Sequence, residues 1–476
     1  MNPKTVGIFG AAGALCAVAI FLVVQQISGP TPQPPRPDPR PVPVPVPVVG
    51  TPDSDVTFGS RVRAHAMLSQ SYLMQGSSND VYLNVDLTPA NIAGTRAPFA
   101  AAIVIDRSGS MAGAKIDNAQ DAALAFLKNM RDDDQITIVT YGSDVTVNLR
   151  LAHVGNVRST AQRIIRGIDA GGGTNIAGGL RSAISQLATA NGPRRVVLIS
   201  DGRPTEGERR PPMLASIAAE GREQGLSFTS IGVGIDYDEN VMENIALRGG
   251  GSFYHLRQFA MLAGIMTKEF QSVDTIVASD IRLRIDPGSN VSVEEVYGYD
   301  FSREGSSVVV RVGDISRGTQ LRVVARSRVN AGSPAVARFA GLGLGYRIPD
   351  TGAGESATAS LTFASTPDIA IASGSQKVDV VVNSNKVAAA SIMRQSMEQM
   401  ASGQRAEGVA SLKRAKAQLD TAASMAPAAA APALKQEAER YNDLGAKAGA
   451  VQLDSADGQD FVKSNRAAAF SEQQGR

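Results

Sequence analysis

Five side chains with oxygen donors lie at or near the ends of apolar runs, in three separate stretches of the chain. They are Asp106, Ser108, Ser110, Thr174 and Asp201. The apolar run 101–105 directly precedes Asp106, and the run 196–199 ends two residues before Asp201. None of these stretches contains a thiol or a histidine. A set of hard oxygen ligands with few carboxylates favours Mg²⁺ or Mn²⁺ over Ca²⁺.

The two apolar runs are typical of parallel strands that are buried on both faces. Thr174 belongs to the glycine-rich loop 171–175, which precedes a helical stretch. Open α/β sheets bind ligands at the carboxyl ends of their strands, so one fold can gather all three stretches. Asp-x-Ser-x-Ser alone is a weak signal, because the same residues also cap helices. A metal held mainly by neutral hydroxyls keeps positive charge and attracts an acidic group.

The pattern resembles the von Willebrand factor type A (VWA) domain, whose metal-ion-dependent adhesion site uses Asp-x-Ser-x-Ser, a threonine and an aspartate. The resemblance covers about residues 98–273 and includes all five ligand positions. It implies that Ser108, Ser110 and Thr174 contact the metal. It further implies that Asp106 and Asp201 hold the metal directly or through water, and that a partner's Asp or Glu completes the octahedron. The alternative is a degenerate domain that keeps these residues and binds no ion.

Strands and helices alternate regularly through this region. The predicted strands are 101–105, 135–141, 145–151, 196–200 and 227–233, with 145–151 as an antiparallel edge. The predicted helices are 115–130, 159–168, 176–190, 213–224, 240–248 and 259–273. This order predicts an α/β doubly wound (Rossmann-like) sheet with helices on both faces. Asp238 is predicted to cap a helix, and the glycine run 249–251 to form a helix stop and a turn.

The N-terminal part of the chain has the composition of a membrane anchor followed by a spacer. Residues 6–24 are apolar or small and uncharged, which is long enough to cross a bilayer. Lys4 precedes them and no convincing cleavage site follows, so we predict a signal anchor, an N-terminal transmembrane helix within residues 1–29. Residues 30–53 are predicted to form a Pro-rich spacer in the polyproline II conformation. The arrangement resembles membrane-anchored bacterial VWA proteins, with the folded part periplasmic or extracellular.

Residues 54–97 and 274–385 carry short strands separated by Gly, Pro, Ser and Asp turns, a spacing typical of a β-sandwich. The strands predicted before the α/β domain are 56–70 and 80–87. Those predicted after it are 281–285, 291–299, 308–312, 320–329, 335–347, 357–363 and 377–382. We expect both sets to form one all-β sandwich, with the VWA domain, residues 98–273, inserted in it or flanked by it.

Residues 386–450 are Ala-rich with apolar residues at helical spacing, which predicts a helical region of two or three antiparallel helices. The predicted helices are 387–400, 406–423 and 433–448. Residues 451–476 include a polar end, and we predict that they form a flexible tail.

Composition and missing motifs exclude several classes of function. The chain has no Gly-x-Ser-x-Gly elbow, no P-loop and no His-Glu-x-x-His, so no enzymatic activity is predicted. A net charge of +2 gives no case for nucleic acid, and 5% aromatic residues without tryptophan argue against a carbohydrate-stacking surface. No small-molecule substrate is predicted. The single cysteine, Cys16, precludes an intrachain disulfide.

We therefore predict a metal-dependent adhesion or assembly module that binds an acidic group of a protein partner outside the cytoplasmic membrane. Two alternatives belong to other classes. One is a VWA co-chaperone subunit that works with an AAA-type ATPase, which requires a cytoplasmic location. The other is a passive scaffold whose helical tail is the binding element.

Overall fold

A computed structural model describes residues 51–91, 97–332 and 335–475. The predicted transmembrane helix and nearly all of the Pro-rich spacer lie outside these residues. Among the helices of the described residues, none combines the length and the apolar character needed to span a bilayer.

The α/β domain is built on a six-stranded sheet with the order β10-β9-β8-β5-β6-β7. Its strands are β5 (Ala100–Asp106), β6 (Gln135–Tyr141), β7 (Val145–His153), β8 (Arg194–Ser200), β9 (Leu226–Val233) and β10 (Gly250–Leu256). All neighbouring pairs are parallel except β6–β7, so β7 is the antiparallel edge that the sequence predicted. The doubly wound fold is thus observed.

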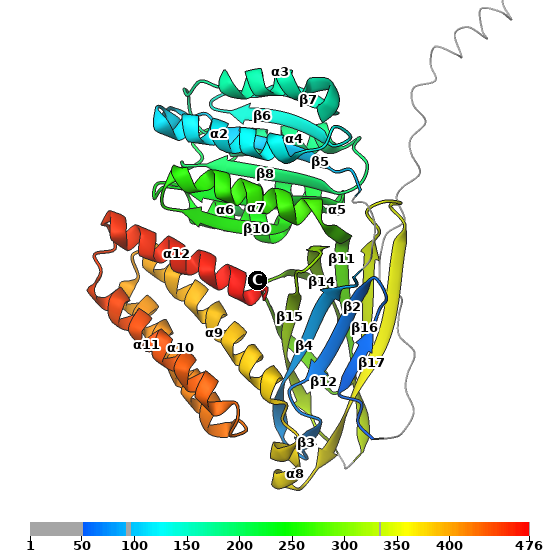
Figure 1. The fold of residues 1–476 in the computed structure, drawn as a ribbon. Helices are drawn as coiled ribbons and strands as arrows, with labels where there is room; N and C mark the ends of the chain where they lie inside the picture. The colour runs from blue at the N-terminus through cyan, green and yellow to red at the C-terminus, as the bar shows by residue number, and fades with distance from the viewer. Residues whose placement is uncertain (1–50, 92–96, 333–334, 476) are drawn as a thin grey trace, which may run out of the picture. The chain divides into compact units, whose positions relative to one another are not determined.

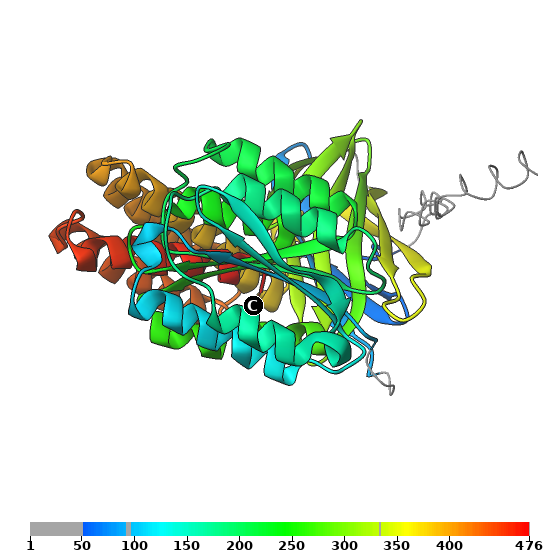
Figure 2. The same ribbon diagram turned by 90° about the horizontal axis from the view of Figure 1, so that it is seen from above.

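Helices cover both faces of this sheet (Figures 1 and 2). The segments are η1 (Gly109–Met111), α2 (Ala114–Asn129), α3 (Val154–Arg166), α4 (Ile176–Leu187), α5 (Pro211–Glu223), α6 (Glu239–Gly249), η2 (Phe259–Met261) and α7 (Leu262–Asp274). All seven residues of β5 are buried. Alternate β5 side chains enter the core with α2, α3 and α7, and those between them enter the core with α4, α5 and α6. Burial on both faces explains the unbroken apolar run.

The prediction of a turn over the glycine run 249–251 is wrong, because strand β10 begins there. Gly250 does end α6, in the left-handed conformation with φ +73°. A Cβ on Gly251 would lie 2.2 Å from the Phe228 carbonyl oxygen, so the backbones of β10 and β9 approach too closely for a larger residue. The predicted cap is correct, since the Asp238 carboxylate accepts from Asn240 N at 2.9 Å.

The strands before and after the α/β domain form two further sheets. They are β1 (Asp55–Phe58), β2 (Val62–Leu68), β3 (Tyr72–Met74), β4 (Ser78–Pro89), β11 (Ile276–Pro287), β12 (Val291–Tyr297), β13 (Asp300–Glu304), β14 (Ser307–Ser316), β15 (Leu321–Asn330), β16 (Val336–Arg347) and β17 (Gly354–Thr366). The sheet orders are β1-β2-β4-β15-β12 and β13-β14-β11-β16-β17-β3, and one hydrophobic cluster joins both sheets. Because β4 pairs with β15, the α/β domain is an insertion between strands of this β-domain.

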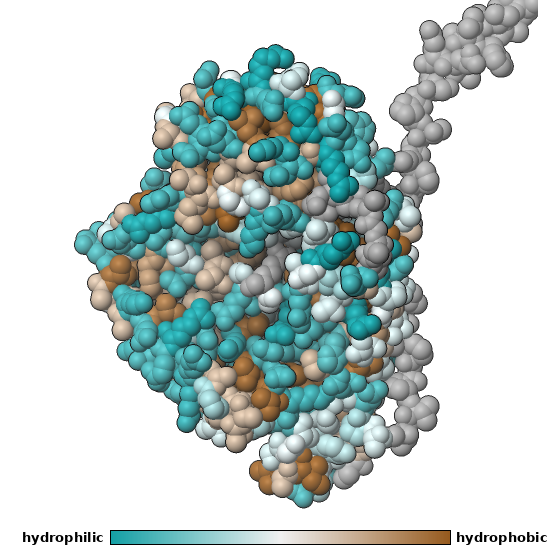
Figure 3. Space-filling model, in the orientation of Figure 1, coloured by the Kyte–Doolittle hydropathy of each residue, from teal (hydrophilic) through white to brown (hydrophobic). Residues whose placement is uncertain are grey.

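The C-terminal region is helical from residue 369 onward. Its helices are α8 (Ile369–Gly374), α9 (Val378–Ala401), α10 (Arg405–Met425), α11 (Ala431–Ala450) and α12 (Ala456–Gln473). On the face shown in Figure 3 the described surface is mainly hydrophilic, and hydrophobic side chains gather at the end that carries α8. Ile369 and Ile371 are 73% and 48% exposed there.

The predicted strand 377–382 is wrong, because these residues lie at the start of α9. Its valines are β-branched and alternate partly with polar residues, which favours a strand by propensity alone. Tertiary packing overrides this preference. Val381 belongs to the core shared by α9–α12, and the Ser384 hydroxyl donates to Asn84 Oδ1 of β4 at 2.8 Å.

The prediction that 451–476 is a flexible tail is also wrong. Residues 456–473 form α12, which begins with Ser455 as its cap and packs Phe470 into the core of the α/β domain. The helix was missed because much of its attachment is polar. Arg466, which is 1% exposed, pairs with the fully buried Glu243 of α6, and Lys463 pairs with Glu239. Sequence periodicity does not reveal charges that are buried against partners some 220 residues away.

We predict that Glu243→Gln destabilises the protein by about 3 kcal/mol, because it leaves the buried Arg466 without its counter-charge. Arg394 of α9 also pairs with Glu243, at 2.8 Å, and would lose its carboxylate too. Urea unfolding followed by circular dichroism measures the effect. Arg257→Gln is the control, because it removes only the ion pairs of an exposed arginine with Asp457 and Asp460 of α12 and should lower stability far less. Equal losses in the two variants would contradict this account of α12.

Candidate metal centre

The carboxylate of Asp106, at the carboxyl end of β5, is fully buried and held at both oxygens. Its Oδ1 accepts from the Ser108 backbone N–H at 2.8 Å, and its Oδ2 accepts from the Ser200 hydroxyl at 2.7 Å. The first contact folds the turn after β5 back onto the strand end. The second ties β5 to the neighbouring strand β8. Asp106 is therefore a fixed point around which the loops are arranged.

A chain of hydrogen bonds runs from this turn to Asp201. The hydroxyls of Ser108 and Ser110 lie 3.0 Å apart, and the Ser110 hydroxyl donates to Asp201 Oδ1 at 2.8 Å. Ser108 and Asp201 are almost fully buried, whereas Ser110 is exposed. The site thus has a buried base and an open side, at which an external group can approach.

Thr174 reaches the same place from the loop before α4. A Cβ added to Gly202 would lie 3.5 Å from Ser110 Oγ and 3.6 Å from Thr174 Oγ1, so both hydroxyls flank one glycine. The backbone of Thr174 is fixed by Thr205, whose hydroxyl accepts from Thr174 N at 2.9 Å. All five residues predicted from the sequence therefore meet at one end of the sheet.

The glycine-rich loop is held directly against the Asp-x-Ser-x-Ser turn. Gly109 N donates to the Gly172 carbonyl at 3.0 Å, and Gly173 N donates to the Ser143 hydroxyl at 2.8 Å. Gly172 has φ +86°, and a Cβ there would lie 2.9 Å from Ser143 N. A glycine is required for both reasons. Arg107 also contributes, since its Nη1 donates to the Gly171 carbonyl at 3.5 Å.

Burial raises the pKa of Asp106 to about 6, against the hydrogen bonds from Ser108 and Ser200, which lower it. The nearby charge of Asp201 raises it further. Lys115 of α2 supplies the compensating positive charge, with Nζ 2.5 Å from Asp201 Oδ2. The same ammonium lies 5.9 Å from the centre of the Phe259 ring. The Lys115 ammonium is therefore the positive charge beside the carboxylates of Asp106 and Asp201.

The donor set fits a small divalent cation. All five side chains present oxygen, and three of them are neutral hydroxyls. The Ser108 hydroxyl is hydrogen-bonded to that of Ser110, which donates to Asp201. The Thr174 hydroxyl lies beside the same glycine, Gly202, as the Ser110 hydroxyl. An ion bound here would replace those hydrogen bonds. Within the described part of the chain, no group of three or more His, Cys, Asp or Glu side chains gathers in a metal-binding arrangement.

Sequence reasoning missed the residues that support the predicted ligands. Ser200 positions Asp106, Thr205 positions the Thr174 loop, and Lys115 pairs with Asp201. Only Ser200 carries a signal in the sequence, because it directly precedes a predicted ligand at a strand end. The other two reach the site through the folding of loops and helix α2, which spacing does not reveal.

Comparison with known proteins identifies the α/β domain. A sequence profile of the von Willebrand factor type A domain matches residues 102–268. The uncharacterized protein YfbK of Escherichia coli (strain K12) is 29% identical over 188 residues, 38% of this chain and 32% of that protein. Human inter-alpha-trypsin inhibitor heavy chain H4 is 31% identical over 168 residues, 33% of this chain and 18% of that protein. The chain therefore matches a third or less of these relatives' length.

Two solved structures share the fold over most of the chain. The von Willebrand factor type A protein from Catenulispora acidiphila has a TM-score of 0.68 and 16% identity, covering 88% of this chain and 97% of that one. The ArnB paralog VWA2 from Sulfolobus acidocaldarius has a TM-score of 0.63 and 18% identity, covering 87% and 99%. At these identities the likeness concerns the fold alone, and it extends well beyond the α/β domain.

We predict that Lys115→Gln tightens Mg²⁺ binding by about tenfold, equivalent to about 1.4 kcal/mol, because the ammonium competes with the ion for Asp201. Calorimetric titration with Mg²⁺ measures the change. Lys128→Gln is the control, since Lys128 is an exposed lysine in the last turn of the same helix. Unchanged or weaker Mg²⁺ binding in Lys115→Gln would show that the lysine does not oppose the ion.

Proposed function

Residues 102–268 form a domain of the von Willebrand factor type A family, and we propose that this domain is a metal-dependent protein-binding module for adhesion or assembly. The observation that carries the proposal is the meeting of five oxygen-bearing side chains at one end of the sheet, with Ser110 on the exposed side. No enzymatic role is proposed.

In this proposal Ser108, Ser110 and Thr174 contact a Mg²⁺ or Mn²⁺ ion, while Asp106 and Asp201 hold it directly or through water. The ion supplies a positive charge to which an Asp or Glu of a partner protein binds. Hydroxyl ligands leave that charge largely uncompensated. The carboxylate–ion contact is therefore stronger than an exposed salt bridge, which contributes about 0–1 kcal/mol.

The structure supports the proposal through the rigidity of the site. Asp106 is fixed at both oxygens, and the Thr174 loop is tied to the Asp-x-Ser-x-Ser turn through Gly109 and Gly172. Ligands that are already in place lose little conformational entropy when the ion binds. The open side at Ser110 leaves room for one external ligand.

We further propose that the folded part is displayed outside the cytoplasmic membrane, on a single-pass anchor. The support is the uncharged apolar run 6–24 and the Pro-rich stretch that follows it. The alternative of a co-chaperone for an AAA-type ATPase requires the opposite location, so topology separates the two.

We predict that Mg²⁺ raises the midpoint of thermal unfolding and that Asp106→Ala and Thr174→Ala abolish the rise. Ion binding to the folded state stabilises it by mass action, by about 2.7 kcal/mol at a concentration about 100 times Kd. For a domain of this size the midpoint then rises by roughly 5–10 °C. Circular dichroism melts with and without chelator measure the shift.

Thr160→Ala on α3 is the matched control, because it removes a threonine hydroxyl of the same domain away from the site. It should keep the full Mg²⁺ effect. A shift that persists in Thr174→Ala, or that never occurs in the unaltered protein at millimolar Mg²⁺, would contradict the metal site.

We predict that alkaline phosphatase fused after residue 49 is active in a bacterial host, because that enzyme folds only where disulfides form. Enzyme activity normalised to the amount of fusion protein is the readout. A fusion that removes residues 6–24 is the control and should be inactive. Activity confined to the control, or absent from both, would favour the cytoplasmic alternative.

A further inference from the structure

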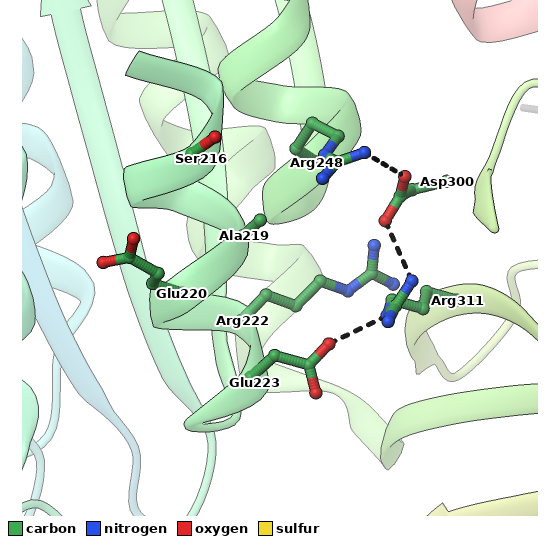
Figure 4. A pocket seen from close by; sticks show the side chains of 8 residues that line it. All are labelled: Ser216, Ala219, Glu220, Arg222, Glu223, Arg248, Asp300 and Arg311. Atoms are coloured by element: carbon green, nitrogen blue, oxygen red, sulfur yellow. Dashed lines mark hydrogen bonds and ion pairs between the residues drawn. The ribbon is translucent and has the colours of Figure 1, made fainter. Parts of the chain in front are cut away.

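A cavity of about 300 Å³ lies between the α/β domain and the β-domain. Helices α5 and α6 supply Arg222 and Arg248, and strands β13 and β14 supply Asp300 and Arg311. Figure 4 shows these side chains converging from the two domains. Three guanidinium groups thus line one cavity, and they differ in how their charges are compensated.

Two of the three arginines are already paired with carboxylates. Asp300, which is 8% exposed, accepts from Arg248 at 3.0 Å and from Arg311 at 3.2 Å. Arg311 also pairs with Glu223 at 2.9 Å. Each of these two carboxylates is thus shared, since Glu223 also contacts Arg282 at 3.4 Å. A third carboxylate of the lining, Glu220, points away from the arginines in Figure 4. The two carboxylates that face the arginines are therefore engaged by Arg248, Arg311 and Arg282.

Arg222 has no such partner. It is 6% exposed, and its Nη1 is buried without a hydrogen-bond partner among the described residues. Figure 4 shows its side chain reaching from α5 toward Arg311 without a marked contact. A buried cation without a hydrogen-bonded counter-charge destabilises the folded protein.

A glycine of the neighbouring backbone leaves space for the Arg222 guanidinium group. A Cβ on Gly250 would lie 2.6 Å from Arg222 Cζ, so the guanidinium packs directly on this glycine at the α6–β10 junction. Burial lowers the pKa of Arg222 to about 10. The charges of Asp280, Asp300 and Asp314 oppose the change, and the charge of Arg311 adds to it. The group therefore remains a cation at neutral pH.

We propose that this cavity binds a phosphate group, as inorganic phosphate or as a small phosphomonoester, with Arg222 as its main charge partner. Guanidinium groups match phosphate oxygens in charge and in fork geometry. Arg248 and Arg311 line the same cavity and have further N–H donors beyond those given to Asp300. A ligand here would touch both domains at once. A volume of about 300 Å³ lies at the lower end of the range for small-molecule sites.

The site is separate from the candidate metal centre, and none of its lining residues is one of the five oxygen donors. The test therefore uses the full-length protein in chelator, so that phosphate cannot bind through a metal ion. Failure of phosphate binding leaves the metal proposal untouched, and the reverse also holds.

The experiment is calorimetric titration with inorganic phosphate, and separately with phosphoserine, in a buffer free of other multivalent anions. We expect binding that weakens at least about tenfold in Arg222→Gln, the loss expected when one charge-assisted contact is removed. Because Arg222 is buried, a second variant leaves it in place. Ser216→Asp puts a carboxylate into the cavity wall and should weaken binding similarly, while its neutral isostere Ser216→Asn should bind normally.

The two titrants distinguish the source of the phosphate group. Binding of phosphoserine at least as tight as that of inorganic phosphate assigns the site to a phosphomonoester, and binding of inorganic phosphate alone assigns it to the free ion. Absence of binding of both at millimolar concentration would overturn the proposal. So would equal affinity in the unaltered protein and Arg222→Gln, or equal weakening in Ser216→Asp and Ser216→Asn.

Discussion

The buried carboxylate of Asp106 is the constraint on which the site depends. A carboxylate that is fully removed from water must be satisfied by fixed donors, and here the Ser108 N–H and the Ser200 hydroxyl provide them. The first donor dictates the turn that presents Ser108 and Ser110. The second links β5 to β8 and so brings Asp201 alongside. The remaining loop, with Thr174, is attached to that turn through Gly109 and Gly172. One desolvated group therefore sets the positions of the other four.

Much of the α/β domain was predictable because its signals are local. A strand covered on both faces is a continuous apolar run, and the helices that cover it show their own period and caps. The predicted bounds of β6 are those observed, and the other predicted elements of this domain overlap their observed counterparts. The five donors were identified for the same reason, since each lies at a strand end or in a loop beside one. Strand β10 was missed because it begins with glycines, which in a sequence usually indicate a turn. Here Gly251 allows the backbones of β10 and β9 to approach closely.

Ion pairs between residues far apart in the chain could not be predicted from the sequence. Helix α12 is attached by Arg466 and Lys463 to carboxylates of α6, and Lys115 reaches Asp201 from α2. A buried ion pair has no periodic pattern, so each partner looks like an ordinary surface charge. The valines at the start of α9 give a signal for the wrong structure. Their strand propensity is overridden by packing against α10–α12 and against β4.

The pairing of β4 with β15 has a consequence for how the protein is made. Asp86 and Arg322, an ion pair across these two strands, are 236 residues apart in the chain. During synthesis β4 leaves the ribosome long before β15, and the whole α/β domain is translated between them. One edge of β4 must therefore wait unpaired while the inserted domain folds. Unpaired strand edges are prone to wrong association. Rapid folding of the inserted domain, which brings its two ends into the β-domain, shortens that wait and lowers the loop-closure cost of the final sheet.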